Sequence, residues 1–127
     1  MRASLILTCS VLLLTGCLKN PEASSGAREA VRLTGGDPKL GREALKQYGC
    51  RSCHTIKGVE GASAKVGPAL SGLRDRNVIA GKVPNSPDNL MKWIRDPRAM
   101  DPKTAMPNTG VTEQDAKNIA AYLYALP

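Results

Sequence analysis

The chain has 127 residues, with 18 basic and 11 acidic side chains, so its formal net charge at pH 7 is +7. This length holds one globular domain at most, which excludes a multidomain architecture. The chain has no Phe, one Trp and three Tyr, which is few aromatic side chains for the core of a small domain.

Residues 1–16 have the pattern of a cleavable export signal. Arg2 supplies positive charge, and ten mostly apolar residues follow from Leu5 to Leu14. Ten residues cannot cross a bilayer as a helix, so we interpret the stretch as a signal peptide and not as a membrane span. The ending Leu-Thr-Gly-Cys17 resembles the lipobox of bacterial lipoproteins, which implies cleavage before Cys17 and lipidation of its sulfur. The alternative is an ordinary secretory signal with an incidental Cys17.

Residues 17–36 are predicted to form a lipidated, flexible tether. The run from Leu18 to Gly26 is polar and contains Pro, Ser and Gly. A short helical extension over Ala27 to Leu33, ended by Gly35-Gly36, is compatible with the pattern. With lipid on Cys17 the protein would be exported and anchored at the periplasmic or extracytoplasmic face of a membrane.

Residues 37–127 are predicted to form an all-α domain of three or more helices joined by long loops. Two helices begin with a capping residue followed by proline, at Asp37-Pro38 and Ser86-Pro87. Gly49 ends the first helix, and Asp96-Pro97 stops the second. Thr112 caps a third helix, with Asp115 at the capping-box position.

Two long loops connect these helices. Thr55 to Lys82 is rich in Gly and has no sustained period, although Ser71 to Arg76 is compatible with one helical turn. Arg98 to Thr109 is a proline-punctuated loop. Loops of this length are uncommon unless they hold something, so we expect both to surround a bound group.

The stretch Cys50-Arg51-Ser52-Cys53-His54 identifies that group. Two thiols three residues apart, followed by an imidazole, form the attachment pattern for c-type haem, in which both sulfurs bond the vinyl groups and the histidine ligates iron. A redox disulfide would need a βαβ context, and no alternating strand pattern lies nearby. Structural zinc would need four ligands, but only these two thiols and one imidazole remain once the N-terminal cysteines are set aside. The sequence therefore predicts one covalent haem c, which also supplies the missing apolar volume.

The second axial ligand of the iron must come from another residue type, because His54 is the only histidine in the chain. The remaining soft donors are Met91, Met100 and Met106. Met91 lies within a predicted helix, whereas the other two lie in the loop before the last helix. We prefer Met106 because Pro107 would stiffen the backbone beside it, and Met100 remains an alternative.

From Pro38 to Leu126 the chain resembles the class I c-type cytochromes. The resemblance depends on an ordered set of motifs: Gly41 and Leu45, Cys50-x-x-Cys53-His54, Gly67-Pro68-x-Leu70-x-Gly72, Leu90-x-x-Trp93-Ile94-x-x-Pro97, Met106-Pro107 and Ala121-Tyr122-Leu123. The Trp93-Ile94-x-x-Pro97 stretch and the Met106-Pro107 pair look especially like cytochrome c domains that serve terminal oxidases. A departure is that Leu45 and Tyr48 stand where many members have Phe.

The resemblance implies roles for individual residues. Gly41 should allow the first helix to cross the last one closely, near Tyr122. The carbonyl of Pro68 should accept a hydrogen bond from the His54 ring nitrogen that does not bind iron. Trp93 should pack near the haem, close to a propionate.

The functional expectation is a membrane-tethered monohaem cytochrome c that transfers single electrons between respiratory or dehydrogenase partners, and not an enzyme. Nine basic and three acidic residues lie between Lys39 and Lys82, so redox partners with acidic docking surfaces are expected, and nucleic acid is not. One alternative is a haem c enzyme or gas sensor in which Met106 dissociates. Another is a binding lipoprotein without haem.

Overall fold

The computed structural model describes residues 25–127, so the predicted signal peptide and Cys17 lie outside the described residues. The helices are α1 (Ser25–Thr34), α2 (Pro38–Gln47), α3 (Pro87–Arg95), α4 (Pro97–Met100) and α5 (Glu113–Ala125). Two 3-10 turns, η1 (Cys50–Ser52) and η2 (Leu73–Asp75), and an antiparallel pair of short strands, β1 (Val78–Ile79) and β2 (Val83–Pro84), connect them. The mostly helical fold agrees with the all-α prediction.

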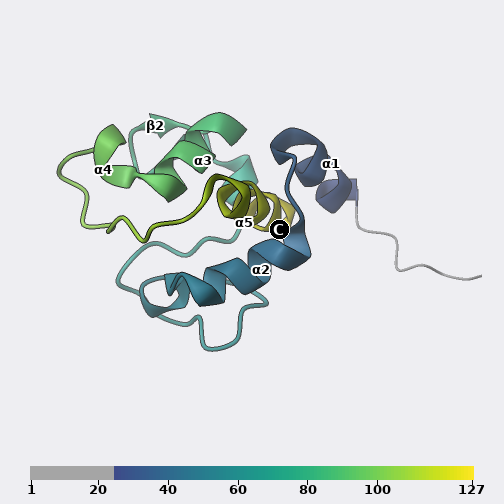
Figure 1. Cartoon of the computed structure of the whole chain (residues 1–127), viewed down its shortest axis with the longest axis horizontal. Helices are drawn as coiled ribbons and strands as arrows, with labels where there is room; N and C mark the ends of the chain where they lie inside the picture. The colour runs from purple at the N-terminus through teal and green to yellow at the C-terminus, as the bar shows by residue number, and fades with distance from the viewer. Residues whose placement is uncertain (1–24) are drawn as a thin grey trace, which may run out of the picture.

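Helix α5 lies at the centre, with α1, α2 and α3 arranged around it (Figure 1). Its central position follows from its composition, because most of its small and apolar side chains are buried against its neighbours. These are Ala116, Ile119, Ala120, Ala121, Leu123 and Tyr124. Short side chains let neighbouring helices approach closely on several sides. The helix therefore acts as the common surface on which the other three assemble.

The close crossing of α2 and α5 occurs at Gly41. A Cβ atom added to Gly41 would overlap the carbonyl of Asn118 and lie 3.0 Å from the Ile119 nitrogen. The predicted close crossing is therefore present, but one turn earlier in α5 than the expected contact near Tyr122. Asn118 is buried and its Oδ1 accepts a hydrogen bond of 2.9 Å from the Asp37 N–H, which joins the start of α2 to α5.

The predicted helix starts are confirmed by their caps. The side chains of Asp37, Ser86 and Thr112 accept hydrogen bonds from the backbone N–H groups of Lys39, Asn89 and Asp115, at 2.7, 3.1 and 3.1 Å. Each cap satisfies a donor that has no partner within its helix. Local sequence therefore determines where α2, α3 and α5 begin.

Helix α1 covers the segment Ala27 to Leu33, where the sequence was compatible with a short helical extension, but it is docked and not part of a flexible tether. Ser25–Thr34 is helical and packs on α5, burying Ala30 and Thr34. Gly36 follows at a point where an added Cβ would overlap the Lys117 carbonyl. The tether prediction relied on the polar composition, but two small buried side chains are enough to dock a short helix on a surface that is itself made of small residues.

Two further elements lie in segments predicted to be loops. Asp96 ends α3 and also caps α4, because its Oδ1 accepts a hydrogen bond of 3.2 Å from the Ala99 N–H. The β1–β2 hairpin turns through Ala80 and Gly81, which both have positive φ, and buries only Ile79 and Val83. Strands of two residues are too short to show an alternating pattern in the sequence.

Replacing Gly41 with Ala should force α2 away from α5, because the backbone of Asn118 cannot move aside as a side chain could. Overpacking of this kind costs about 1–3 kcal/mol, and we expect that loss in the free energy of unfolding measured with guanidinium. Lys39→Ala, an exposed substitution in the same helix, is the matched control. Equal effects of the two substitutions would contradict the crossing.

Tyr48 joins the end of α2 to the start of α5. Its hydroxyl donates a hydrogen bond of 2.7 Å to Asp115 Oδ2, which also accepts one of 2.8 Å from the Thr112 hydroxyl. These bonds, the one from Tyr48 first, hold the pKa of the Asp115 carboxyl below its usual value. The ionised carboxylate is therefore the form that the fold stabilises.

Tyr48→Phe should lower the free energy of unfolding at neutral pH by about 1 kcal/mol, the usual range for one hydrogen bond. A lowered pKa contributes stability that is fully present above the unfolded value of about 4 and is lost as the pH falls through the folded value. The difference between Tyr48→Phe and the unaltered protein should therefore shrink below about pH 4. Guanidinium unfolding across this range measures it, and a difference independent of pH would argue against the bond.

Candidate functional site

The Cys50–His54 segment leaves the end of α2 as a tight turn. Gly49 has a φ of 72°, which stops the helix, and Cys50–Ser52 then forms η1. The carbonyl of Cys50 accepts hydrogen bonds from the N–H groups of Cys53 and His54, at 3.3 and 3.0 Å. The two thiols and the imidazole are thus held on one turn, as their spacing predicts.

Both thiols are free and half-buried. Burial raises the pKa of the Cys50 thiol above its ordinary value. The protonated thiol is therefore the favoured form of Cys50, and addition to a vinyl group consumes such an S–H. A reactive, low-pKa cysteine of the thioredoxin type would need the opposite shift.

The imidazole of His54 is fixed by the predicted residue. Its Nδ1 lies 2.7 Å from the carbonyl oxygen of Pro68. A carbonyl can only accept, so Nδ1 carries the hydrogen and Nε2 keeps a free lone pair for a metal. This is the tautomer and the orientation that an iron-ligating histidine requires.

Gly67, the residue before Pro68, lies directly against the His54 ring. Its N–H donates a hydrogen bond of 2.7 Å to the Cys53 carbonyl, which ties the two segments together. An added Cβ would overlap Cε1 of His54 and lie 2.7 Å from Nδ1. The Gly67-Pro68 pair is therefore more than a turn, because the glycine leaves the space that the ring occupies.

Trp93 and Met106 form a second group of the predicted residues. The buried indole of Trp93 on α3 donates a hydrogen bond from Nε1 to the sulfur of Met106, at 3.2 Å. The N–H of Met106 donates to the Thr104 hydroxyl, also at 3.2 Å. The indole N–H of Trp93 is thus directed at a thioether, whereas the predicted contact of Trp93 with a haem propionate stays a prediction.

Met100 lies at the end of α4 and lines an open groove of about 520 Å³ between α3, α4 and residues 108–111. The lining of this groove also includes Lys92, Arg95 and Asp96, and it contains no residue of the Cys50–His54 segment. Met91, on α3, lines a smaller neighbouring groove of about 210 Å³. Of the three candidate methionines, Met106 is the one that contacts Trp93, and it lines neither of these two grooves.

Cys50, Leu70 and Met106 all pack as half-buried side chains against the same hydrophobic core. Met91 and Met100 pack there as well, so the margin of the core holds one thiol and three thioethers, with the second thiol and the imidazole on the same turn as Cys50. Soft sulfur and borderline nitrogen donors around an apolar space suit a covalently attached haem iron. The residues present fit this group.

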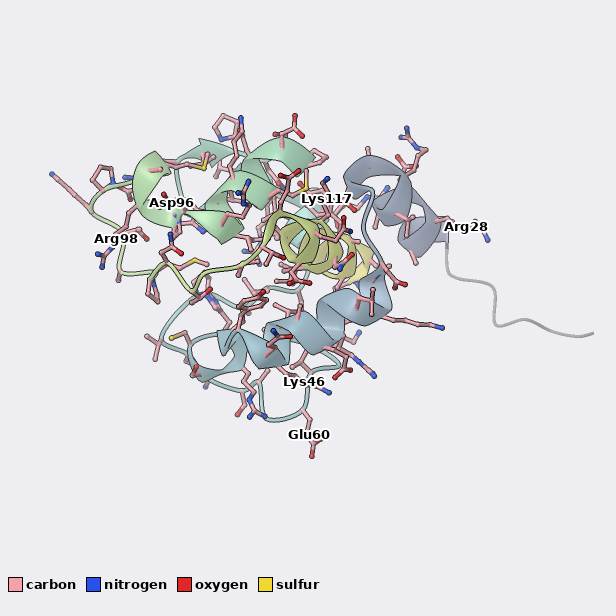
Figure 2. The ribbon with its side chains drawn as sticks, in the orientation of Figure 1. Arg28, Lys46, Glu60, Asp96, Arg98 and Lys117 are labelled. Carbon is pink, nitrogen blue, oxygen red and sulfur yellow. The ribbon has the colours of Figure 1, made fainter. Side chains whose placement is uncertain are left out.

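Exposed basic side chains lie within the haem-attachment motif and in the segment that follows it. Arg51, Lys57 and Lys65 are exposed and form no ion pair within residues 25–127, whereas Lys46 pairs with Glu43 at 3.1 Å. Figure 2 shows Lys46 on α2 in the lower part of the view, whereas Arg98 lies at the left, near α4. Across residues 25–127, no helix is long and apolar enough to span a membrane.

Sequence reasoning missed the residues that organise the loop carrying Met106. Asp101 pairs with Lys82 of the β1–β2 turn at 2.9 Å, although the two residues lie far apart in the chain. Neither residue belongs to a motif. Only the folded arrangement brings Lys82 and Asp101 together, so the sequence contains no local pattern that would have predicted the pair.

Comparisons with known proteins agree with this geometry. Residues 38–127 match the family model for cytochrome c. The chain is 36% identical over 87 residues to cytochrome c oxidase subunit 2 of Alkalihalophilus pseudofirmus and 28% identical over 88 residues to that of Bacillus subtilis. Each match covers 68% of this chain and 25% of the oxidase subunit, so the chain spans only part of those proteins.

A relative of comparable size is cytochrome c2 of Blastochloris viridis, which is 34% identical over 100 residues, covering 68% of this chain and 76% of that protein. Residues 38–127, which match the family model, contain the Cys50–His54 turn, the Pro68 carbonyl that orients its histidine, and the Trp93–Met106 pair. The chain therefore belongs to the cytochrome c family of electron-transfer proteins, and its cofactor is covalently bound haem c.

Proposed function

We propose that this protein is a membrane-tethered monohaem cytochrome c that carries single electrons between respiratory or dehydrogenase partners. The observation that carries the proposal is the fixed His54 ring, whose Nδ1 is held by Pro68 at 2.7 Å and whose Nε2 is free. The haem supplies a one-electron couple between ferric and ferrous iron. The protein's contribution is to hold two axial donors in place in both oxidation states.

Four residues are proposed to hold the group. Cys50 and Cys53 provide the thioether links, His54 Nε2 one axial ligand and Met106 Sδ the other. A sulfur atom has more than one lone pair, so Met106 can accept the Trp93 N–H and still present a lone pair to a metal. Two retained axial donors leave no easy site for O₂ or peroxide, which favours electron transfer over the enzyme or sensor alternative.

The proposed anchor is lipid on Cys17, with export directed by residues 1–16. Because α1 packs on α5, the proposed tether is shorter than residues 17–36. The seven residues from Leu18 to Ser24 could span at most about 25 Å. The electron would therefore be exchanged close to the membrane surface, within reach of membrane-bound partners.

We propose that these partners present acidic surfaces to the exposed Arg51, Lys57 and Lys65. Unpaired surface cations steer an oppositely charged partner and fix its orientation. Several relatives are named as subunits of cytochrome c oxidase, so a terminal oxidase is the class of acceptor that we propose. The donor would be a respiratory reductase or a dehydrogenase.

Met106→Ala should abolish the charge-transfer band between the thioether and ferric iron, whereas Met100→Ala should leave it unchanged. Absorption spectra of the oxidised haem proteins measure this directly. The reverse result would assign Met100 as the ligand. The unaltered reduced protein should bind carbon monoxide slowly and incompletely at neutral pH, and rapid, complete binding would favour the sensor or enzyme.

Gly67→Ala should displace the His54 ring and break its hydrogen bond to Pro68. The Nδ1 proton of the reduced haem protein should then exchange with solvent at least about tenfold faster, the factor for roughly 1.4 kcal/mol, as measured by NMR. Val66→Ala is the matched control, because the Val66 side chain is 82% exposed in the same segment. An exchange rate unchanged by Gly67→Ala would contradict the proposed support of the ring.

A further inference from the structure

The loop carrying Met106 is organised by Asp101, which ends α4. Asp101 Oδ1 accepts a hydrogen bond of 3.2 Å from the Lys103 N–H, and the Asp101 carbonyl accepts one of 3.0 Å from the Thr104 N–H. The Thr104 hydroxyl in turn accepts from the Met106 N–H at 3.2 Å. A continuous set of hydrogen bonds therefore runs from Asp101 to the backbone of Met106.

Asp101 is itself held from outside the loop. Its Oδ2 lies 2.9 Å from Nζ of Lys82, and its side chain is only 15% exposed. The same contact lowers the pKa of the Asp101 carboxyl, so the group stays ionised at neutral pH. The ion pair is the connection that Asp101 makes to the β1–β2 hairpin.

The backbone on which Lys82 lies is held in place by hydrogen bonds next to the β1–β2 hairpin. Next to β2, the Asn85 amide donates hydrogen bonds to the carbonyls of Leu73 and Arg76, at 2.7 and 2.8 Å. The Tyr124 hydroxyl on α5 donates to Asn85 Oδ1 at 2.7 Å. The hairpin is thus attached to the central helix, and the ion pair transmits that attachment to the Met106 loop.

We propose that the Lys82–Asp101 ion pair is a brace that positions Met106 and thereby sets how readily its thioether leaves the iron. Lys82 and Asp101 are positioning residues, since neither is an iron ligand. The inference rests on the proposed role of Met106. It assigns to the short β1–β2 hairpin, which none of the haem motifs includes, the task of stabilising the sixth ligand.

The test is displacement of Met106 by imidazole in the oxidised haem protein. The loss of the charge-transfer band measures how much Met106 has been displaced. Breaking the pair with Lys82→Met or Asp101→Asn should raise the affinity for imidazole about fivefold, the upper range for a partly exposed ion pair. Asp101→Asn keeps an oxygen that can accept from Lys103. The double variant should be no more affected than either single one, because both remove the same interaction.

Lys117→Met is the matched control for Lys82→Met. It breaks the exposed pair between Lys117 and Glu113 on α5 and, like Lys82→Met, removes one positive charge. It should leave the affinity for imidazole unchanged. The swapped pair, Lys82→Asp with Asp101→Lys, should restore most of the original value. That rescue separates a positioning role from a general loss of stability, which far-UV circular dichroism and guanidinium unfolding also monitor.

Two different results would overturn the brace. If Lys82→Met changes the affinity for imidazole no more than Lys117→Met, the inference fails while Met106 remains the ligand. If the unaltered oxidised protein has no thioether charge-transfer band, Met106 is not the ligand and the proposed ligand set fails together with the brace.

Discussion

The crossing of α2 over α5 at Gly41 is the contact on which the other parts of the structure depend. Without a side chain at Gly41, the backbone of α2 meets the Asn118 carbonyl directly, and the buried Asn118 side chain then binds the Asp37 N–H. At its other end α2 leads through Gly49 into the Cys50–His54 turn. The position of the haem-attachment segment relative to the core is therefore set by how closely two helices approach.

The site is assembled from segments that do not adjoin in sequence. One group consists of His54 with the Gly67-Pro68 turn, and a second group consists of Trp93 with Met106. Each donor has a partner that fixes it: a carbonyl for the imidazole and an indole N–H for the thioether. With the proposed ligand set, electron transfer would benefit from this arrangement, because axial donors that stay in place keep the geometry of the metal nearly the same in both oxidation states.

Much of this arrangement could be predicted from local signals. The caps at Asp37, Ser86 and Thr112 locate three helices because each side chain satisfies backbone donors a few residues away. The Pro68 contact with His54 followed from the family resemblance. By contrast, the short helix that the sequence allowed over Ala27 to Leu33 was assigned to the tether, since its two buried side chains, Ala30 and Thr34, form too weak a pattern to distinguish docking from exposure. The α2 crossing was also placed one turn away from its true position at Asn118.

The sequence by itself determined the chemistry of this protein: two thiols and an imidazole at a spacing that suits one haem, a small set of thioethers, and helix boundaries marked by capping residues. These features are local, so a few neighbouring residues are enough to specify them. Only the tertiary structure decided that Trp93 donates to Met106 and that Lys82 reaches Asp101. Such contacts arise when packing around α5 brings distant segments together, and no local pattern encodes that packing.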